Sequence, residues 1–398
     1  MTAFDALWPT ILGVGRHAAT GGYRRYAWSD ADLTLREWFA GCAAQRGMEV
    51  EEDRNGNLWA WWMPPGWSGY PTDAFDTGSH LDSVPDGGAF DGPLGVVSAL
   101  LTIDALRAAG LTPSRPVAVV NFGDEEGARF GIACAGSRMV TGALPRDRAL
   151  GLRDGDGTSM AEAMSAAGHD TAHVGRDEET LRRVGCFVEL HVEQGRGLID
   201  LGRPVAVGTG IWPHGRWRME FAGQANHAGT TRLEDRHDPM LDYAAAVLRA
   251  RELAQEHGIV ATCGKVVVEP NGVNAIPSRV RGWLDARGAD AGAVRALVAG
   301  LSQDREIHEE SWTPATPFDP ALSDRCAAVL DDAPRLASGA GHDAGVLAEA
   351  GVATAMLFVR NPTGISHSPA EFAERDDCLR GVAALTAVVT DLVTGHAA

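Results

Sequence analysis

Short runs of mainly aliphatic residues alternate with longer amphipathic segments through the first half of this chain. Residues 117–122 (VAVVNF) and 185–192 (GCFVELHV) are typical of buried strands. Residues 29–47 start with a Ser-Asp cap and end at a glycine, as helices do. Strands that alternate with helices predict an α/β domain with a mainly parallel sheet. The Asn55-Gly56 pair predicts a hairpin within residues 48–62.

The buried, mainly aliphatic strands of the first half stop near Gly208–Gly210. A strand of this kind returns only at residues 353–369. The segment between them predicts a strand at 215–229 and a helix at 238–258. Two strands follow within 261–288, and then a second helix at 290–311. This is close to the β-α-β-β-α-β pattern of a ferredoxin-like domain. A proline-rich stretch, 312–320, is the expected return linker. We therefore predict an inserted domain, residues 210–318, within a catalytic domain formed by residues 1–209 and 319–398.

Bulk properties exclude several classes of function. A chain of 398 residues is long enough for two domains, and its net charge of −18 disfavours nucleic acid as a partner. The sequence contains no uncharged apolar run of about 18 residues, so we predict no membrane span. The N-terminus does not resemble a signal peptide. The six cysteines form no C-x-x-C pair, which is typical of buried thiols in a cytoplasmic protein.

Histidines and acidic residues gather just after the predicted strands. The richest stretch is residues 78–95, GSHLDSVPDGGAFDGPLG. In an open α/β sheet, sites form beyond the carboxyl ends of the strands. Four strand ends would therefore deliver to one crevice these side chains: His80, Asp82, Asp91, Glu125, Glu126, His191 and His367.

The number and type of these groups fit two divalent metal ions, zinc or manganese. Asp91 is the candidate shared ligand, because a carboxylate can bridge two ions. We expect His80 and His191 to complete one metal site, and Glu126 and His367 the other. Gly88 and Gly92 are expected to let the backbone turn sharply around Asp91.

Two further carboxylates have predicted roles beside the metal ligands. Asp82 is expected to orient the His80 ring. Glu125 is the candidate general base and acid of a metal-assisted hydrolysis. Each motif alone has an ordinary alternative: a solvated loop, a helix cap, or a histidine satisfied in the core. Their joint placement at strand ends favours the two-metal interpretation.

Six motifs in order resemble one known family: GSHLDSVPDGGAFDGPLG, DEEGARF, ELHVEQG, NHAGTT, GAGHDAG and GISHSP. The chain is similar, from about residue 20 onward, to the hydantoinase/carbamoylase amidases among the dinuclear metalloamidases. The resemblance implies the same metal ligands and the same role for Glu125. It also implies a three-layer α/β/α catalytic domain and a smaller α+β lid domain that forms a homodimer.

The resemblance also implies substrate contacts. His227 of NHAGTT would polarise the scissile carbonyl in the neighbouring subunit. Asn274 and Arg287 would grip the substrate carboxylate, for which a planar guanidinium is suited. Gln194 and His342 would line the pocket. Simpler roles stay open for two of these residues, a turn for Asn274 and an exposed strand position for Arg287.

The expected activity is hydrolysis of a ureido or N-carbamoyl amino acid, with release of ammonia and carbon dioxide. Allantoate is favoured over N-carbamoyl-L-amino acids on overall similarity alone. An aminoacylase or dipeptidase is the alternative enzyme, but such peptidases usually have a carboxylate where His191 stands. A non-catalytic metal-binding protein is disfavoured, because Glu125 and every expected ligand are present.

Overall fold

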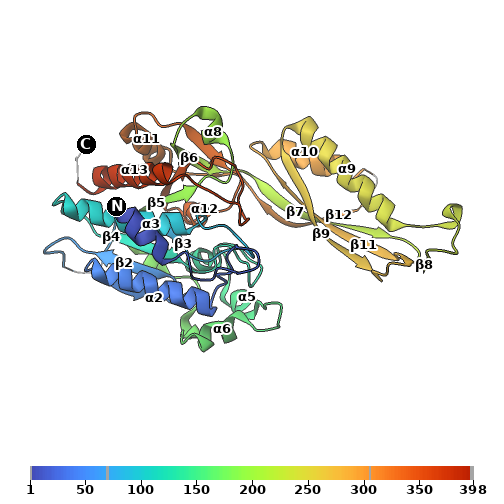
Figure 1. Ribbon diagram of the computed structural model, residues 1–398, viewed down its shortest axis with the longest axis horizontal. Helices are drawn as coiled ribbons and strands as arrows, with labels where there is room; N and C mark the ends of the chain where they lie inside the picture. Colours follow the sequence, from blue (N-terminus) through green and yellow to red (C-terminus); the bar gives the residue numbers. More distant parts are fainter. Residues whose placement is uncertain (1, 69–70, 304–305, 395–398) are drawn as a thin grey trace. The chain divides into compact units, whose positions relative to one another are not determined.

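The computed structural model describes residues 2–68, 71–303 and 306–394 (Figure 1). The chain divides into two compact units. The large unit comprises Met1–Gly210 and Pro317–Ala398, and the small unit comprises Ile211–Thr316. The sequence places the boundaries of the inserted domain at residues 210 and 318. Each unit has a hydrophobic core of its own.

The large unit is built around a nine-stranded sheet. Eight strands follow the order β1-β2-β4-β3-β5-β15-β6-β13, and β14 is the ninth, which pairs with β6. The four strands β4, β3, β5 and β15 run parallel, and β1, β2 and β6 pair antiparallel outside them. The strands are β1 Glu49–Glu52, β2 Leu58–Trp62, β3 Ala74–His80, β4 Val117–Phe122, β5 Val184–Val192, β6 Val205–Ile211, β13 Thr316–Pro317, β14 Arg335–Ser338 and β15 Ala353–Val359. The predicted hairpin is confirmed. The prediction of a mainly parallel sheet needs correction, because the sheet is mixed: four central strands are parallel and the strands on either side of them pair antiparallel.

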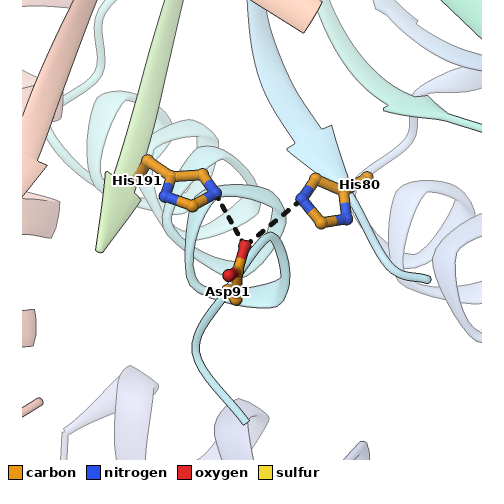
Figure 2. Close-up of side chains that lie close together, drawn as sticks. All are labelled: His80, Asp91 and His191. Carbon is orange, nitrogen blue, oxygen red and sulfur yellow. Dashed lines mark ion pairs between the residues drawn. The ribbon is translucent and has the colours of Figure 1, made fainter. Parts of the chain in front are cut away.

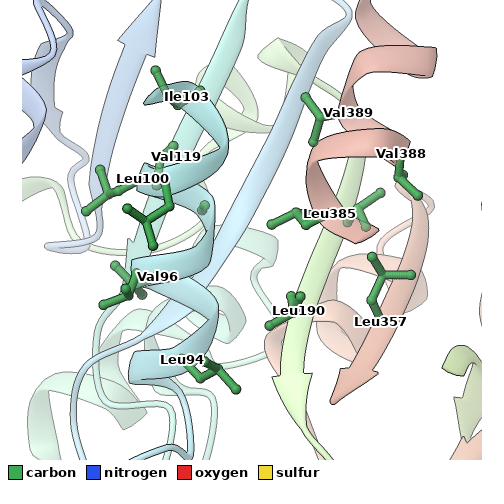
Figure 3. Close-up of a cluster of buried hydrophobic side chains, with 14 of the residues drawn as sticks. Leu94, Val96, Leu100, Ile103, Val119, Leu190, Leu357, Leu385, Val388 and Val389 are labelled. Carbon is green, nitrogen blue, oxygen red and sulfur yellow. The ribbon is translucent and has the colours of Figure 1, made fainter. Parts of the chain in front are cut away.

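Helices cover both faces of this sheet, so the α/β prediction is confirmed. Along β5, Val188 and Leu190 face a core that also contains side chains of α2 (Asp30–Gln45), α3 (Pro93–Ala108), α11 (Pro320–Val329) and α13 (Arg375–Val393). Figure 3 shows part of this core, where side chains of α3 and α13 gather near Leu190 of β5 and Leu357 of β15. On the opposite face, Phe358 of β15 contacts His342 at the start of α12 (Asp343–Glu349). Leu357 and Val359 of β15 belong to the first core and Phe358 faces the other layer, so alternate residues of this strand serve two layers.

The remaining helices of the large unit are short and lie mostly between β4 and β6 in sequence. They are α1 Ala3–Leu7, α4 Ala135–Thr141, α5 Arg146–Gly151, α6 Met160–Ala166, α7 Glu178–Arg183 and α8 Gly197–Leu201. Helix α2 begins where the sequence predicts, since the Ser29 hydroxyl accepts the Asp32 N–H. Gly47, at φ +59°, follows its end.

The small unit is a four-stranded antiparallel sheet with two helices, α9 (Pro239–His257) and α10 (Ala291–Leu301), packed on one face. Its strands are β7 His214–Ala222, β9 Val260–Glu269, β11 Arg279–Arg287 and β12 Ile307–Thr313, in the order β12-β7-β11-β9. This order and the β-α-β-β-α-β sequence of elements match the ferredoxin-like prediction. Two short strands, β8 (Asn226–His227) and β10 (Ala275–Ile276), pair separately.

Two predictions for this region are wrong. The second helix ends at Leu301, and residues 307–313 form strand β12 instead of continuing it. Ile307 and Trp312 pack against the core of the small unit, so tertiary contacts decide the strand. The proline-rich linker is also shorter than predicted, because Thr313 still belongs to β12 and α11 starts at Pro320.

The remaining sequence predictions concern cysteines and membrane spans. Cysteines 42, 134, 186, 326 and 378 are buried and unpaired, while Cys263 is half-buried. Among the described residues, no helix is both long and apolar enough to cross a membrane.

Candidate metal centre

One group of possible metal ligands lies at the carboxyl ends of two neighbouring parallel strands. His80 ends β3, His191 lies near the end of β5, and Asp91 is in the turn before α3. Figure 2 shows both imidazoles directed at the Asp91 carboxylate. His191 Nε2 is 3.1 Å and His80 Nε2 is 3.7 Å from Asp91 Oδ1. Asp91 is 6% exposed and both histidines are 1% exposed, so the group is screened from water.

The two rings are oriented as metal-binding histidines are. His191 Nδ1 is 2.8 Å from the Val192 carbonyl oxygen, and His80 Nδ1 is 3.3 Å from the Asp82 carbonyl oxygen. Protons on both Nδ1 atoms leave the Nε2 lone pairs facing Asp91. Neither buried Nε2 has a hydrogen-bond partner among the described residues. A metal ion would satisfy both atoms, so these residues fit the expected group.

Asp82 fastens two parts of the site together. Its Oδ1 lies 3.3 Å from His80 Nδ1 and accepts the N–H of Glu125 at 3.1 Å. Its Oδ2 accepts the N–H of Glu126 at 3.0 Å. The side chain therefore orients the His80 ring and also fixes the backbone that follows β4.

A second group of possible ligands shares Asp91. His367, in the loop after β15, has its Nε2 3.4 Å from Asp91 Oδ2 and 3.5 Å from Glu126 Oε2. The three residues offer ligand atoms close enough to hold one ion. Asp91 thus presents Oδ1 to one group and Oδ2 to the other, as a carboxylate shared by two ions does.

Buried negative charge dominates this region. Burial, reinforced by Asp91, raises the pKa of Glu126 to about 8. Burial also raises the pKa of Glu125 well above its usual value, against the opposing effect of His80. Burial alone would lower the pKa of His80, but Glu125, Asp82 and Asp91 outweigh it and raise that pKa well above its usual value. Crowded carboxylates with this electrostatics favour cations, either protons or metal ions.

Glu125 stands beside the ligand groups without belonging to either. Its Oε2 is 3.7 Å from His80 Nε2, and its Oε1 accepts the Cys134 thiol at 3.2 Å. At 6% exposed, it is a buried carboxylate next to the possible metal positions. This is the place in which a general base could take a proton from water.

Gln194 and His342 also lie close to the ligands. Gln194 Nε2 donates to Asp91 Oδ2 at 2.8 Å, so it contacts a proposed ligand directly. The His342 ring centroid is 4.6 Å from that of His191, and burial together with the His191 charge lowers its pKa well below the usual value. Glu189, His191 and His342 form a third possible ligand group. That group is less suited to a metal, because Ser79 and the Ala344 N–H already occupy the Glu189 oxygens.

The other three predicted residues lie in the small unit. His227 of β8 is paired with Ala275 of β10, next to Asn274, and its Nδ1 accepts the Gly229 N–H. His227 and Asn274 are therefore neighbours. Arg287 ends β11, and Asp285 binds its guanidinium through two contacts of 2.6 and 3.0 Å.

The prediction for Gly88 needs correction, while that for Gly92 holds. Gly92 has φ +83°, and a Cβ there would lie 2.4 Å from the His80 ring. Gly88 has no positive φ, and a Cβ there would instead lie 2.3 Å from the Glu371 carboxyl group. Glu371 is a residue that sequence reasoning missed. Burial, reinforced by Asp91, raises its pKa to about 7. The only signal was a carboxylate four residues after His367.

Comparison with known proteins agrees with this geometry. A model of peptidase family M20/M25/M40 matches residues 77–391. The chain belongs to this family. It is 35% identical to an N-carbamoyl-L-amino acid amidohydrolase of Geobacillus stearothermophilus, over 98% of this chain and 99% of the relative. It is 32% identical to allantoate amidohydrolase of Escherichia coli (98% and 97%) and 30% identical to ureidoglycolate hydrolase of Oryza sativa (92% and 80%).

Solved structures place the chain within one branch of the family. A hydantoinase/carbamoylase family amidase from Burkholderia ambifaria superposes with a TM-score of 0.81, at 32% identity over 99% of this chain and 98% of that one. The resemblance inferred from the six motifs is therefore confirmed. The protein is a hydrolase of carbon–nitrogen bonds other than peptide bonds.

Proposed function

We propose that the protein hydrolyses the carbamoyl group of a linear ureido acid, using two divalent metal ions, zinc or manganese. The observation that carries the proposal is the Asp91 carboxylate, which offers one oxygen to His80 and His191 and the other to Glu126 and His367. Amidohydrolases with ureido substrates among the relatives support the same chemistry.

In the proposed mechanism, bound metal ions supply Lewis acidity to the site. Glu125 accepts a proton from the attacking water and passes it to the leaving nitrogen, which departs as ammonia. The remaining carbamate loses carbon dioxide and leaves the amine of the acid. The position of Glu125 suits this cycle, because it is a buried carboxylate whose Oε2 lies 3.7 Å from the ligand His80 and can hold the proton between the two steps.

Substrate binding is proposed to involve five side chains. Gln194 and His342 lie beside the ligands and would contact the ureido group. Asn274 and Arg287 would hold the substrate carboxylate, and Asp285 already orients the guanidinium for a forked contact. His227 would donate to the scissile carbonyl oxygen.

We propose allantoate as the substrate, with N-carbamoyl-L-amino acids as close alternatives. Ureidoglycolate shares the same ureido and carboxylate groups and belongs in the same comparison. An aminoacylase or dipeptidase activity is disfavoured, because His191 stands where peptidases of the wider superfamily carry a carboxylate.

The test is ammonia release by Zn²⁺- or Mn²⁺-loaded protein with allantoate, ureidoglycolate, N-carbamoyl-L-amino acids and N-carbamoyl-β-alanine. N-acetyl-L-amino acids release no ammonia and need an amine assay alongside. Glu125→Gln is the matched control, because it keeps the shape of the side chain and removes the base. Turnover of a ureido acid that is lost in this variant supports the proposal. Turnover of N-acetyl substrates alone would refute it.

We further propose that the protein is a homodimer formed through the small unit. Val260 and Val266 are exposed on the edge strand β9. Leu241 and Leu248 are exposed on one face of α9, two turns apart. An exposed edge strand beside exposed leucines is typical of an interface.

The six unpaired cysteines support the cytoplasmic location that the sequence predicts.

The geometry of the small unit supports a role for both subunits in each site. Arg287 is at one end of β11, whereas His227 and Asn274 are beyond the other end, where Arg279 begins the strand. Eight residue steps along a strand span on the order of 25 Å. One substrate molecule cannot bridge that distance, so His227 and Arg287 would serve one site only from different subunits. Mixing Glu125→Gln and His227→Ala proteins under subunit exchange should restore part of the activity, and no recovery in mixed dimers would refute the shared site.

A further inference from the structure

Glu371 is a buried carboxylate that joins the loop of Asp91 to the loop of His367. Its Oε1 accepts the backbone N–H of Phe90 at 2.9 Å and that of Asp91 at 3.0 Å. Its Oε2 accepts the Ser366 hydroxyl at 3.2 Å. The side chain is 5% exposed. Two segments 280 residues apart in sequence are thereby fixed together beside the possible metal ligands.

The backbone at Gly88 leaves room for this carboxylate. A Cβ at Gly88 would lie 2.3 Å from the carboxyl carbon and from Oε1 of Glu371. Real Cβ atoms essentially never approach another atom so closely, so any other residue at position 88 would displace Glu371. Since Gly88 has no positive φ, its glycine is required by space and not by backbone conformation.

Ser366 extends the same connection to the Asp91 side chain. Its Oγ lies 3.0 Å from Asp91 Oδ2, the oxygen that faces Glu126 and His367. A hydroxyl has one proton to donate, so Ser366 serves Asp91 and Glu371 in turn. Glu371 belongs to none of the possible ligand groups, and the proposed reaction gives it no chemical step.

We propose that Glu371 is a positioning residue that holds Asp91 with one carboxylate oxygen toward each metal position. The inference rests on the proposed two-metal function. Asp91 lies in a turn, outside the helices and strands, so no ladder of backbone hydrogen bonds fixes it. Two N–H bonds to one buried carboxylate are among the stronger hydrogen bonds in proteins and take that role here. Partners of metal ligands act in the same way on ligand orientation.

The test compares metal binding by Glu371→Ala, Glu371→Gln and Glu374→Ala with that of the parent protein. Glu374 is an exposed residue of the same segment and makes no side-chain cap contact, so its variant is the matched control. Each protein is stripped with a chelator and titrated with Mn²⁺ by calorimetry, and the Mn²⁺ electron paramagnetic resonance spectrum is recorded. Circular dichroism establishes that each variant is folded.

We expect the parent and Glu374→Ala to bind two Mn²⁺ ions with a spin-coupled spectrum. Glu371→Ala should bind the second ion at least about tenfold more weakly and give the spectrum of isolated ions. Glu371→Gln keeps an oxygen that accepts both N–H groups, so its second affinity should stay within about threefold of the parent. A merely structural role would not change the spin coupling.

Parent-like affinities and coupling in folded Glu371→Ala would overturn the inference. Equal losses in Glu371→Gln and Glu371→Ala would overturn it too, because the N–H contacts would then not matter. If Glu371→Ala does not fold, Gly88→Ala tests the same contact from the other side, and unchanged metal binding there overturns it. Ammonia release by the parent separates the two proposals: two bound ions without ureido turnover would refute the function and leave the positioning role intact.

Discussion

Gly92→Ala should displace the proposed metal ligand His80, although no ligand is itself substituted. Gly92 precedes α3 at φ +83°, and a Cβ there would lie 2.4 Å from the His80 ring. Ordinary van der Waals contact begins at 3.4 Å, so the ring must move by the difference, 3.4 − 2.4 = 1.0 Å. His80 is 1% exposed and held by Asp82. A ring that moves by this distance therefore leaves the position in which its Nε2 faces Asp91.

The expected effects separate into strain and displacement. A positive φ costs an alanine about 1 kcal/mol of stability. Displacing the ring by about 1 Å should lower metal affinity and turnover by on the order of 100-fold. Gly110→Ala is the matched control, because Gly110 follows the other end of α3 at φ +68° with no atom within 4 Å of its Cβ position.

Urea unfolding and Mn²⁺ titration of both variants make the assay. Gly110→Ala should lose about 1 kcal/mol of stability from its positive φ alone. Gly92→Ala should lose about 1–3 kcal/mol more, because its Cβ also overlaps a buried ring. Only Gly92→Ala should lose metal affinity. The reasoning is wrong if Gly92→Ala binds Mn²⁺ as the parent does, or if Gly110→Ala loses affinity equally.

Three further predictions follow from the same contacts. Glu125→Gln should lower turnover by on the order of 10² to 10⁴ while metal content, measured by elemental analysis, is unchanged. Removing metal with a chelator should lower the melting temperature, and Zn²⁺ or Mn²⁺ should restore it, because ions that bind the folded state stabilise it; an unchanged melting temperature would argue against a built metal site. Burial raises the pKa of Asp32 from 3.8 to about 6 in the folded state. The protonated carboxyl therefore stabilises the fold at a pH below the unfolded-state pKa, and this stability is lost as the pH rises through the folded-state pKa. Relative to Asp32→Asn, the parent should therefore lose about 2 kcal/mol between about pH 4.5 and about pH 7.5 in urea unfolding, and a pH-independent difference would contradict the cause given.

The layers of the fold could be predicted because burial patterns repeat at short range. Residues 117–122 and 186–192 are mainly apolar and are buried on both faces, which a sheet covered by helices on both sides allows. The segment after Leu301 was misjudged because no glycine or proline between Leu301 and Ile307 marks the end of the helix. Contacts of Ile307 and Trp312 with the small core decide that strand, and these are long-range.

The candidate site was predictable where its residues follow strands. His80, Glu126, His191 and His367 follow or end parallel strands, so topology alone gathers them. Contacts between distant loops were not predictable in this way. Glu371 reaches the Asp91 loop only because Gly88 leaves space for it, and a sequence does not show that approach.

An anomalous-difference map from crystals loaded with Mn²⁺ or Zn²⁺ tests the central claim most directly. The account predicts two peaks about 3.5–4 Å apart on either side of the Asp91 carboxylate. One should lie next to His80 and His191, and the other next to Glu126 and His367. A single peak, or a peak among Glu189, His191 and His342 instead, would contradict it.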